Sequence, residues 1–158
     1  MKIKSLILLL MFVGSASAAD KADDWRSNAS VNEKVQNLIE VMPSASVIML
    51  QMGERYKNLY WAAKQEKWDF AEYQMEEMRE LVNMLIITRP GRAETAKMFR
   101  TAVFEKLTTA VESRKWNQFE KGFELLRTEC MQCHARNDHA FITLPIPKSA
   151  NSPVLNMP

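Results

Sequence analysis

The sequence predicts an all-α protein whose main domain is an antiparallel, up-down-up-down four-helix bundle. Three features of the chain predict this fold. Apolar residues recur at the helical period through four long segments. Glycine is scarce, with 4 residues in 158, and runs of β-branched residues are few. One sequence pattern also occurs twice, 48 residues apart, which indicates two copies of a helical hairpin joined by short loops.

Residues 1–18 are typical of a secretory signal peptide. Lys2 and Lys4 give a charged start, residues 6–13 form an apolar core, and residues 16–18 form an Ala-Ser-Ala cleavage site. The apolar core is too short to span a bilayer as a mature helix. We therefore expect an exported protein that is not inserted into a membrane.

The chain is electrically balanced once the signal is removed. Lys2 and Lys4 account for two of the 21 basic residues, which leaves 19 basic residues against 19 acidic ones. A balanced charge gives no reason to expect nucleic acid or an anionic membrane surface as a partner.

Residues 19–43 are expected to form an extension that precedes the bundle. Its first part, residues 20–29, is polar and predicted to be loose. Ser30 and Glu33 have the spacing of a capping box, which predicts a short helix ending near Val41. Pro43 then separates this helix from the bundle.

The bundle is expected over residues 44–136, and an irregular, proline-containing tail over residues 137–158. Caps, breakers and apolar periodicity predict four helices within the bundle. Their expected ranges are about 44–65, 69–88, 92–114 and 117–134.

The repeated pattern lies at the starts of the second and fourth helices. Lys67-Trp68-Asp69 matches Lys115-Trp116-Asn117, and a Glu follows three residues after Asp69 and after Asn117. This arrangement predicts Asp69 and Asn117 as helix caps. It also predicts that the tryptophan before each cap packs back on the first helical turn.

The fourth helix contains the segment Cys130-Met131-Gln132-Cys133-His134, which holds both cysteines of the chain. The spacing C-x-x-C-H is the attachment motif of a c-type haem. Two thiols form thioether bonds with the porphyrin, and the following histidine supplies an axial nitrogen to the iron. We therefore expect one covalent haem c, bound by Cys130 and Cys133, with His134 as the proximal ligand.

Two other uses of the cysteines are weaker. A disulfide between Cys130 and Cys133 would close a very short loop and stabilise the fold little. A structural zinc site needs four ligands, and His139 is the one further nitrogen donor outside the motif. We expect His139 to have a surface or capping role, because it emerges on the same side as His134.

The residue on the far side of the iron is expected from the first two turns of the first helix. In an up-down-up-down bundle the end of the fourth helix lies beside the start of the first. Those turns contain Met49 and Met52, three residues apart. A thioether ligand would give His/Met haem with a raised potential. Met49 is the preferred distal ligand. Met52 as the ligand and an iron without a sixth ligand are the alternatives. Met157 could reach the iron only if the tail wrapped over the haem.

A helical bundle with C-x-x-C-H in its last helix resembles the cytochrome c prime family. The segment Met49-Leu50-Gln51-Met52-Gly53 is similar to that family's distal segment, with Met49 at the distal position. The resemblance implies a haem-binding periplasmic protein that often forms homodimers through its first two helices. Members with methionine ligation transfer electrons, and members with an open sixth position bind small gases. The tail after His134 departs from the family, and it could shield the haem edge or dock a partner.

The expected function is single-electron transfer by a periplasmic monohaem cytochrome, with redox proteins as partners and no enzymatic activity. The alternative is a five-coordinate haem protein that binds nitric oxide or carbon monoxide. A haem peroxidase is a third candidate, and the absence of an evident acid–base pair in the first helix near Met49 counts against it.

Overall fold

The computed structural model describes residues 24–150, and these residues form helices and loops without a strand. The predicted signal peptide and Met157 lie outside the described residues. The chain divides into two compact units between Met42 and Pro43. Within the described range no helix combines the length and apolar character needed to cross a membrane.

The first unit contains the helices α2 (Trp25–Asn28) and α3 (Val31–Glu40). The capping box predicted for α3 is present, because Ser30 accepts from the Glu33 amide and Glu33 accepts from the Ser30 amide. The expectation that residues 20–29 are loose is wrong for α2. The Asp24 carboxylate accepts from the Arg26 amide and so caps this short helix.

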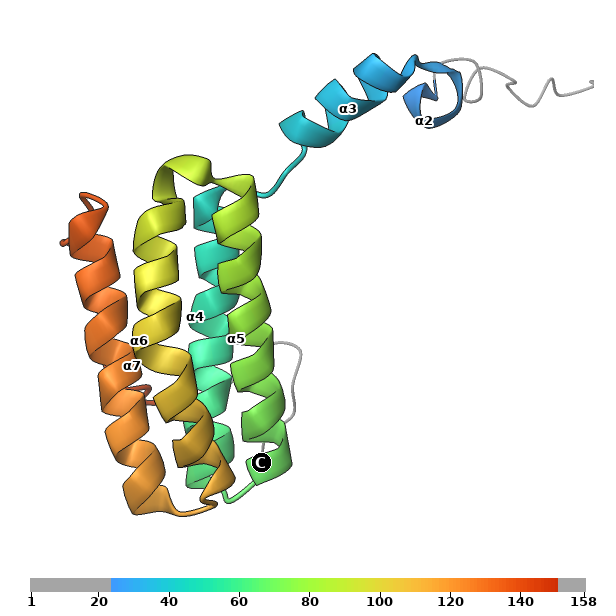
Figure 1. Cartoon of the computed structure of the whole chain (residues 1–158). Helices are drawn as coiled ribbons and strands as arrows, with labels where there is room; N and C mark the ends of the chain where they lie inside the picture. The colour runs from blue at the N-terminus through green and yellow to red at the C-terminus, as the bar shows by residue number, and fades with distance from the viewer. Residues whose placement is uncertain (1–23, 151–158) are drawn as a thin grey trace, which may run out of the picture. The chain divides into compact units, whose positions relative to one another are not determined.

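The second unit is a bundle of four long helices, α4 (Ala45–Lys64), α5 (Trp68–Thr88), α6 (Ala93–Glu112) and α7 (Trp116–Arg136), shown in Figure 1. The short 3-10 helix η1 (Pro90–Arg92) connects α5 to α6. Consecutive helices pack along each other, whereas α4 and α7 approach each other at few points. The bundle is therefore more open between its first and last helices.

The internal repeat predicted from the sequence is present in the helix boundaries. The start and the end of α4 shift by 48 residues to those of α6, and the same shift relates α5 to α7. The turns before α5 and α7 also match, because Glu66 (φ 58°) and Arg114 (φ 51°) both adopt the left-handed conformation. Two equivalent helical hairpins thus build the bundle.

The predicted caps Asp69 and Asn117 are wrong. Helices α5 and α7 begin one residue earlier, at Trp68 and Trp116, and no side chain caps their first amides. The reason lies in the preceding turn, where the Lys67 amide donates to the Ala62 carbonyl and closes α4 in a Schellman motif. The chain then enters α5 directly, so Trp68 lies within the helix and is buried.

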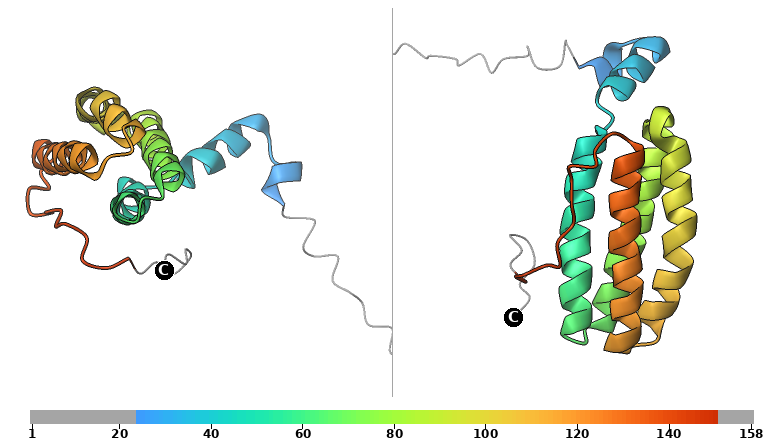
Figure 2. Two further views of the ribbon diagram at one scale, coloured as in Figure 1. Left: turned by 90° about the horizontal axis from the view of Figure 1, so that it is seen from below. Right: turned by 90° about the vertical axis from the view of Figure 1, so that its left-hand side faces the viewer.

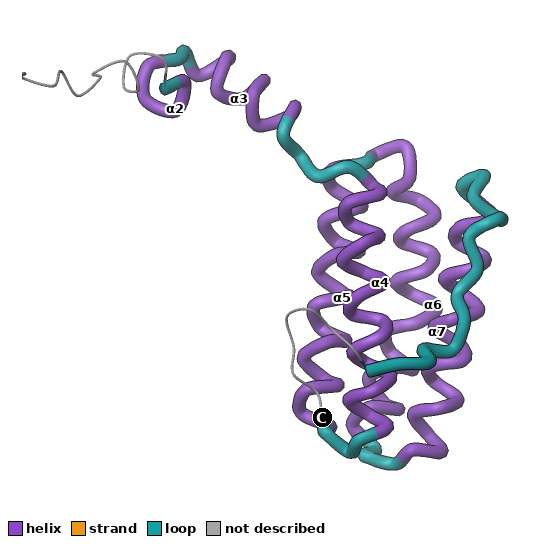
Figure 3. The backbone as a smooth tube through the Cα atoms, turned by 180° about the vertical axis from the view of Figure 1, so that it is seen from behind, coloured by secondary structure: helices purple, strands orange, loops and turns teal. Residues whose placement is uncertain are grey.

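The tail after α7 runs back along the bundle beside the opening between α4 and α7 (Figures 2 and 3). Residues 137–150 contain neither helix nor strand, as expected from their prolines. Leu144 packs against the core, so this part of the tail belongs to the folded unit.

Candidate haem site

A cavity of about 500 Å³ lies at the end of the bundle where α4 and α6 begin and α5 and α7 end. Its size falls within the roughly 300–1,000 Å³ common for ligand and cofactor pockets. Most of the lining is apolar, and Arg92 is the one Lys, Arg, Asp or Glu among the described residues that line it. An apolar cavity of this kind holds a large apolar group and excludes water from it.

Both cysteines and the histidine of the C-x-x-C-H motif line this cavity. They lie on the last turns of α7, where spacings of three and four residues place side chains on one helix face. Cys130 is buried, with 8% of its surface exposed, and Cys133 and His134 are partly exposed. The structure therefore brings both thiols and the imidazole to one apolar space.

The two thiols are free and neutral in the folded chain. Burial raises the pKa of Cys130 to about 12, and burial also raises the pKa of Cys133. Within residues 24–150 no group of three or more Cys, His, Asp or Glu side chains gathers as a metal-binding cluster.

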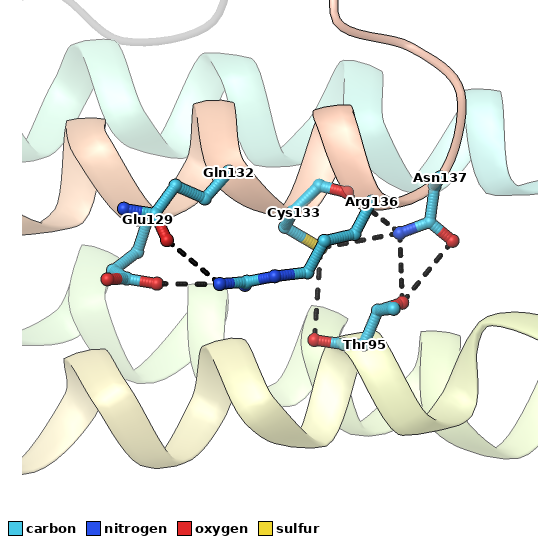
Figure 4. Close-up of polar contacts among 6 residues, drawn as sticks. All are labelled: Thr95, Glu129, Gln132, Cys133, Arg136 and Asn137. Carbon is cyan, nitrogen blue, oxygen red and sulfur yellow. Dashed lines mark hydrogen bonds and ion pairs between the residues drawn. The ribbon is translucent and has the colours of Figure 1, made fainter.

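Cys133 is fixed by the start of α6 and by the residue that follows α7, as Figure 4 shows. Its thiol donates to the Thr95 carbonyl at 3.9 Å. The side-chain amide of Asn137 donates to the Cys133 carbonyl at 2.8 Å and to the Thr95 hydroxyl at 2.9 Å. These bonds tie the end of α7 to the start of α6, so the backbone that presents the second thiol is held in place.

A separate polar group lies beside Cys133 on α7 (Figure 4). Arg136 donates to Gln132 at 2.8 Å and lies 4.0 Å from Glu129, across one and two helical turns (Figure 4). Arg136 is the basic residue that follows His134 two positions later. It does not line the cavity, whereas Arg92 does.

Met49 and Met52 both line the cavity from the first turns of α4. Met49 is partly exposed and also packs against the core, and Met52 is buried with 7% of its surface exposed. The start of α4 and the end of α7 thus border the same space. The placement fits either methionine as a distal residue and does not choose between them.

Several lining residues were not identified from the sequence. Tyr56 lies one turn after Met52 on the same face of α4. The helical spacing that relates the two methionines therefore could have identified Tyr56 as well. Thr95 and Asn137 gave no signal in the sequence. Their roles depend on the contact between α6 and α7.

Part of the tail also lines the cavity, through His139, Ile142 and Leu144. The His139 amide donates to the His134 carbonyl at 2.8 Å, so its backbone closes the end of α7. This agrees with the capping role expected for His139. The contribution of Ile142 and Leu144 could not be located from sequence, since an irregular segment has no periodicity.

Comparisons of this chain with protein-family models, with curated proteins and with solved structures found no significant match.

Proposed function

We propose that this chain is a periplasmic monohaem c-type cytochrome that carries single electrons between redox proteins. One observation carries the proposal. Met49 is far in sequence from Cys130, Cys133 and His134, yet all four border one apolar cavity of about 500 Å³. The C-x-x-C-H motif gives the first three a specific chemical role, and the cavity gives the attached group a place in the fold.

The residues present fit a haem in three respects. The cavity is large and mainly apolar, as the porphyrin face requires. Both thiols border it and neither is used in a disulfide. Arg92 supplies a positive charge at the cavity, which suits the carboxylate of a haem propionate.

In this proposal Cys130 and Cys133 would hold the haem through two thioether bonds, with His134 as the proximal and Met49 as the distal ligand. A bound haem would supply an iron that accepts and releases one electron. Ligation by Met49 would raise the reduction potential relative to a nitrogen or oxygen ligand. The side chains of Val82, Leu85 and Phe99, which are buried at the cavity, exclude water and keep the local dielectric constant low.

The proposal extends to the fold and to the cellular location. We propose an antiparallel up-down-up-down bundle of the cytochrome c prime type, supported by the short connections and by the 48-residue repeat. The sequence of residues 1–18 supports export to the periplasm. Partners would then be periplasmic redox proteins, and a homodimer is the oligomer that the resemblance favours.

Intact-protein mass spectrometry after export from a bacterial host with a haem-attachment system tests this proposal. The unaltered protein should carry one haem that survives denaturation and acid–acetone extraction. Cys130→Ala and Cys133→Ala should each lose one thioether bond and so lower the yield of covalent haem. Met84→Ala, at an exposed site outside the cavity, is the matched control and should keep full loading.

Two results would contradict the assignment. One is an unaltered protein that is exported and folded without haem. The other is a Cys130→Ala variant whose covalent haem is unchanged in both stoichiometry and linkage.

A further inference from the structure

The chain reverses direction directly after α7, which ends at Arg136, two residues past His134. The Asp138 amide donates to the Ala135 carbonyl at 3.3 Å, and Asp138 itself is left-handed with φ 64°. Together with the bond from the His139 amide to the His134 carbonyl, this forms a Schellman motif. The turn sends the following segment back along the bundle beside α4 and α7 (Figure 2).

Three backbone carbonyls of this returning segment accept hydrogen bonds from bundle side chains. The Arg127 guanidinium donates to the Leu144 carbonyl at 3.1 Å. The Tyr56 hydroxyl donates to the Pro145 carbonyl at 3.0 Å. The third bond joins the Ile142 carbonyl to Nδ1 of His134 at 3.2 Å. Donors from both α4 and α7 therefore hold the tail across the opening between these helices.

The proline residues explain why these carbonyls are available. Pro145 and Pro147 have no amide hydrogen, and each restricts the residue before it to an extended conformation. The carbonyls of such a segment do not form the hydrogen bonds of a helix, so they accept hydrogen bonds from donors outside the segment. The bundle supplies these donors.

The bond to His134 fixes the tautomer of the imidazole. A carbonyl oxygen can only accept, so Nδ1 must carry the hydrogen. In the neutral ring Nε2 is then unprotonated and holds the lone pair that binds a metal. Side chains of the same tail segment, Ile142 and Leu144, line the cavity beside the ring.

We propose that the Ile142 carbonyl is the positioning group for His134, and that residues 139–145 form a fixed wall of the haem site. The inference rests on the proposed function. The carbonyl orients the imidazole, selects Nε2 as the ligating nitrogen and makes the ring a stronger donor to iron, as the partners of metal-bound histidines do. The tail after the haem motif is thus part of the ligand sphere.

Releasing the tail tests this inference in the full-length, haem-loaded protein. The double variant Tyr56→Phe/Arg127→Met removes the donors to Pro145 and Leu144. Glu124→Gln is the matched control, because it alters the ion-pair partner of Arg127 and leaves the tail contacts in place. The readout is the iron–histidine stretching band of the ferrous protein, measured by resonance Raman spectroscopy in a Met49→Ala background.

A positioning role predicts that the band shifts to lower frequency in the double variant and stays in place in the control. A tail that only covers the haem predicts the same frequency in both, and this result would overturn the inference while leaving the proposed function intact. If the unaltered chain carries no covalent haem, the proposed function fails and the inference fails with it.

A second measurement does not depend on how the variant folds. In the unaltered ferrous protein labelled with ¹⁵N-histidine, NMR should show a hydrogen on Nδ1 of His134 that exchanges slowly with water. A His134 Nδ1 without a bound hydrogen, or with one that exchanges at the solvent-exposed rate, would overturn the inference.

Discussion

Cys130 shows how a single buried residue links the motif to the fold. Its thiol lies at the end of α7, where burial raises its pKa to about 12. The folded chain therefore keeps the thiol protonated over a pH range in which the unfolded chain releases the proton. In the proposed function, attachment of haem would replace that hydrogen with a carbon–sulfur bond, and the buried position would then hold a neutral thioether.

This difference predicts a pH dependence for the haem-free protein. The contribution of Cys130 to stability is fully present below its ordinary pKa of 9.0 and is lost as the pH rises toward 12. One proton corresponds to a slope of up to about 1.4 kcal/mol per pH unit. Urea unfolding between pH 8 and 11 should show this fall in the free energy of unfolding.

Cys130→Ala is the comparison for that experiment. This variant should reduce the alkaline slope of the free energy of unfolding against pH by an amount that corresponds to up to one proton. The remaining slope reflects Cys133 and Tyr56, whose pKa values are also raised by burial. Equal slopes for the haem-free protein and its Cys130→Ala variant would show that the thiol is not shielded in the folded chain.

Glu66 supports a second prediction, about backbone conformation. It is exposed and left-handed at φ 58°, a conformation that costs a residue with a Cβ roughly 1–2 kcal/mol. Glu66→Gly should therefore raise the free energy of unfolding by about 1 kcal/mol, less the greater entropy of glycine in the unfolded chain. Glu66→Ala keeps the Cβ and should give no such gain in urea denaturation, and a gain equal to that of glycine would contradict this explanation.

At the scale of the helices, the sequence predicted existence and type well and missed some ends. Ser44 caps α4, because its hydroxyl accepts from the Val47 amide. Asp69 looked like an equally good cap, yet α5 begins at Trp68. The preceding turn sets this boundary, because Glu66 adopts a left-handed conformation. This conformation is unfavourable for glutamate, so local propensity does not predict it.

Gly122 explains why α6 and α7 pack so closely, and it supports a prediction about this pair. A Cβ at position 122 would lie 2.7 Å from the Cβ of Ala110, so the helices would have to move apart. Gly122→Ala should lower the free energy of unfolding by about 1–3 kcal/mol. Gly53→Ala in α4 is the control, since a Cβ there meets nothing within 4 Å.

The control should stabilise the haem-free chain by up to about 1 kcal/mol, because alanine favours a helix interior more than glycine does. Thermal or urea denaturation of both variants gives the comparison. A Gly122→Ala variant as stable as Gly53→Ala would show that the two helices do not need the close approach.

At the scale of the whole molecule, the sequence identified the residues of the candidate site but not all of its walls. The motif pointed to Cys130 and His134, and bundle geometry pointed to the start of α4. The structure places Met49 and Met52 at the same cavity as the motif. The returning tail was not predictable in this detail, because its position depends on tertiary contacts with Tyr56, Arg127 and His134.

In the proposed function, the choice between electron transfer and gas binding would depend on the second axial position of the haem iron. Both methionines border the cavity, so the structure leaves three outcomes: Met49, Met52 or no ligand. Each outcome has its own electronic signature, because a thioether ligand gives low-spin iron and an open position leaves the iron free for carbon monoxide.

The visible absorption spectrum of the purified protein in both oxidation states, with and without carbon monoxide, tests this account most directly. We predict a low-spin ferric spectrum with the weak far-red band of sulfur ligation, lost in Met49→Ala and kept in Met52→Ala. A high-spin ferric spectrum, with a ferrous form that binds carbon monoxide at once, would contradict the electron-transfer account and favour gas binding.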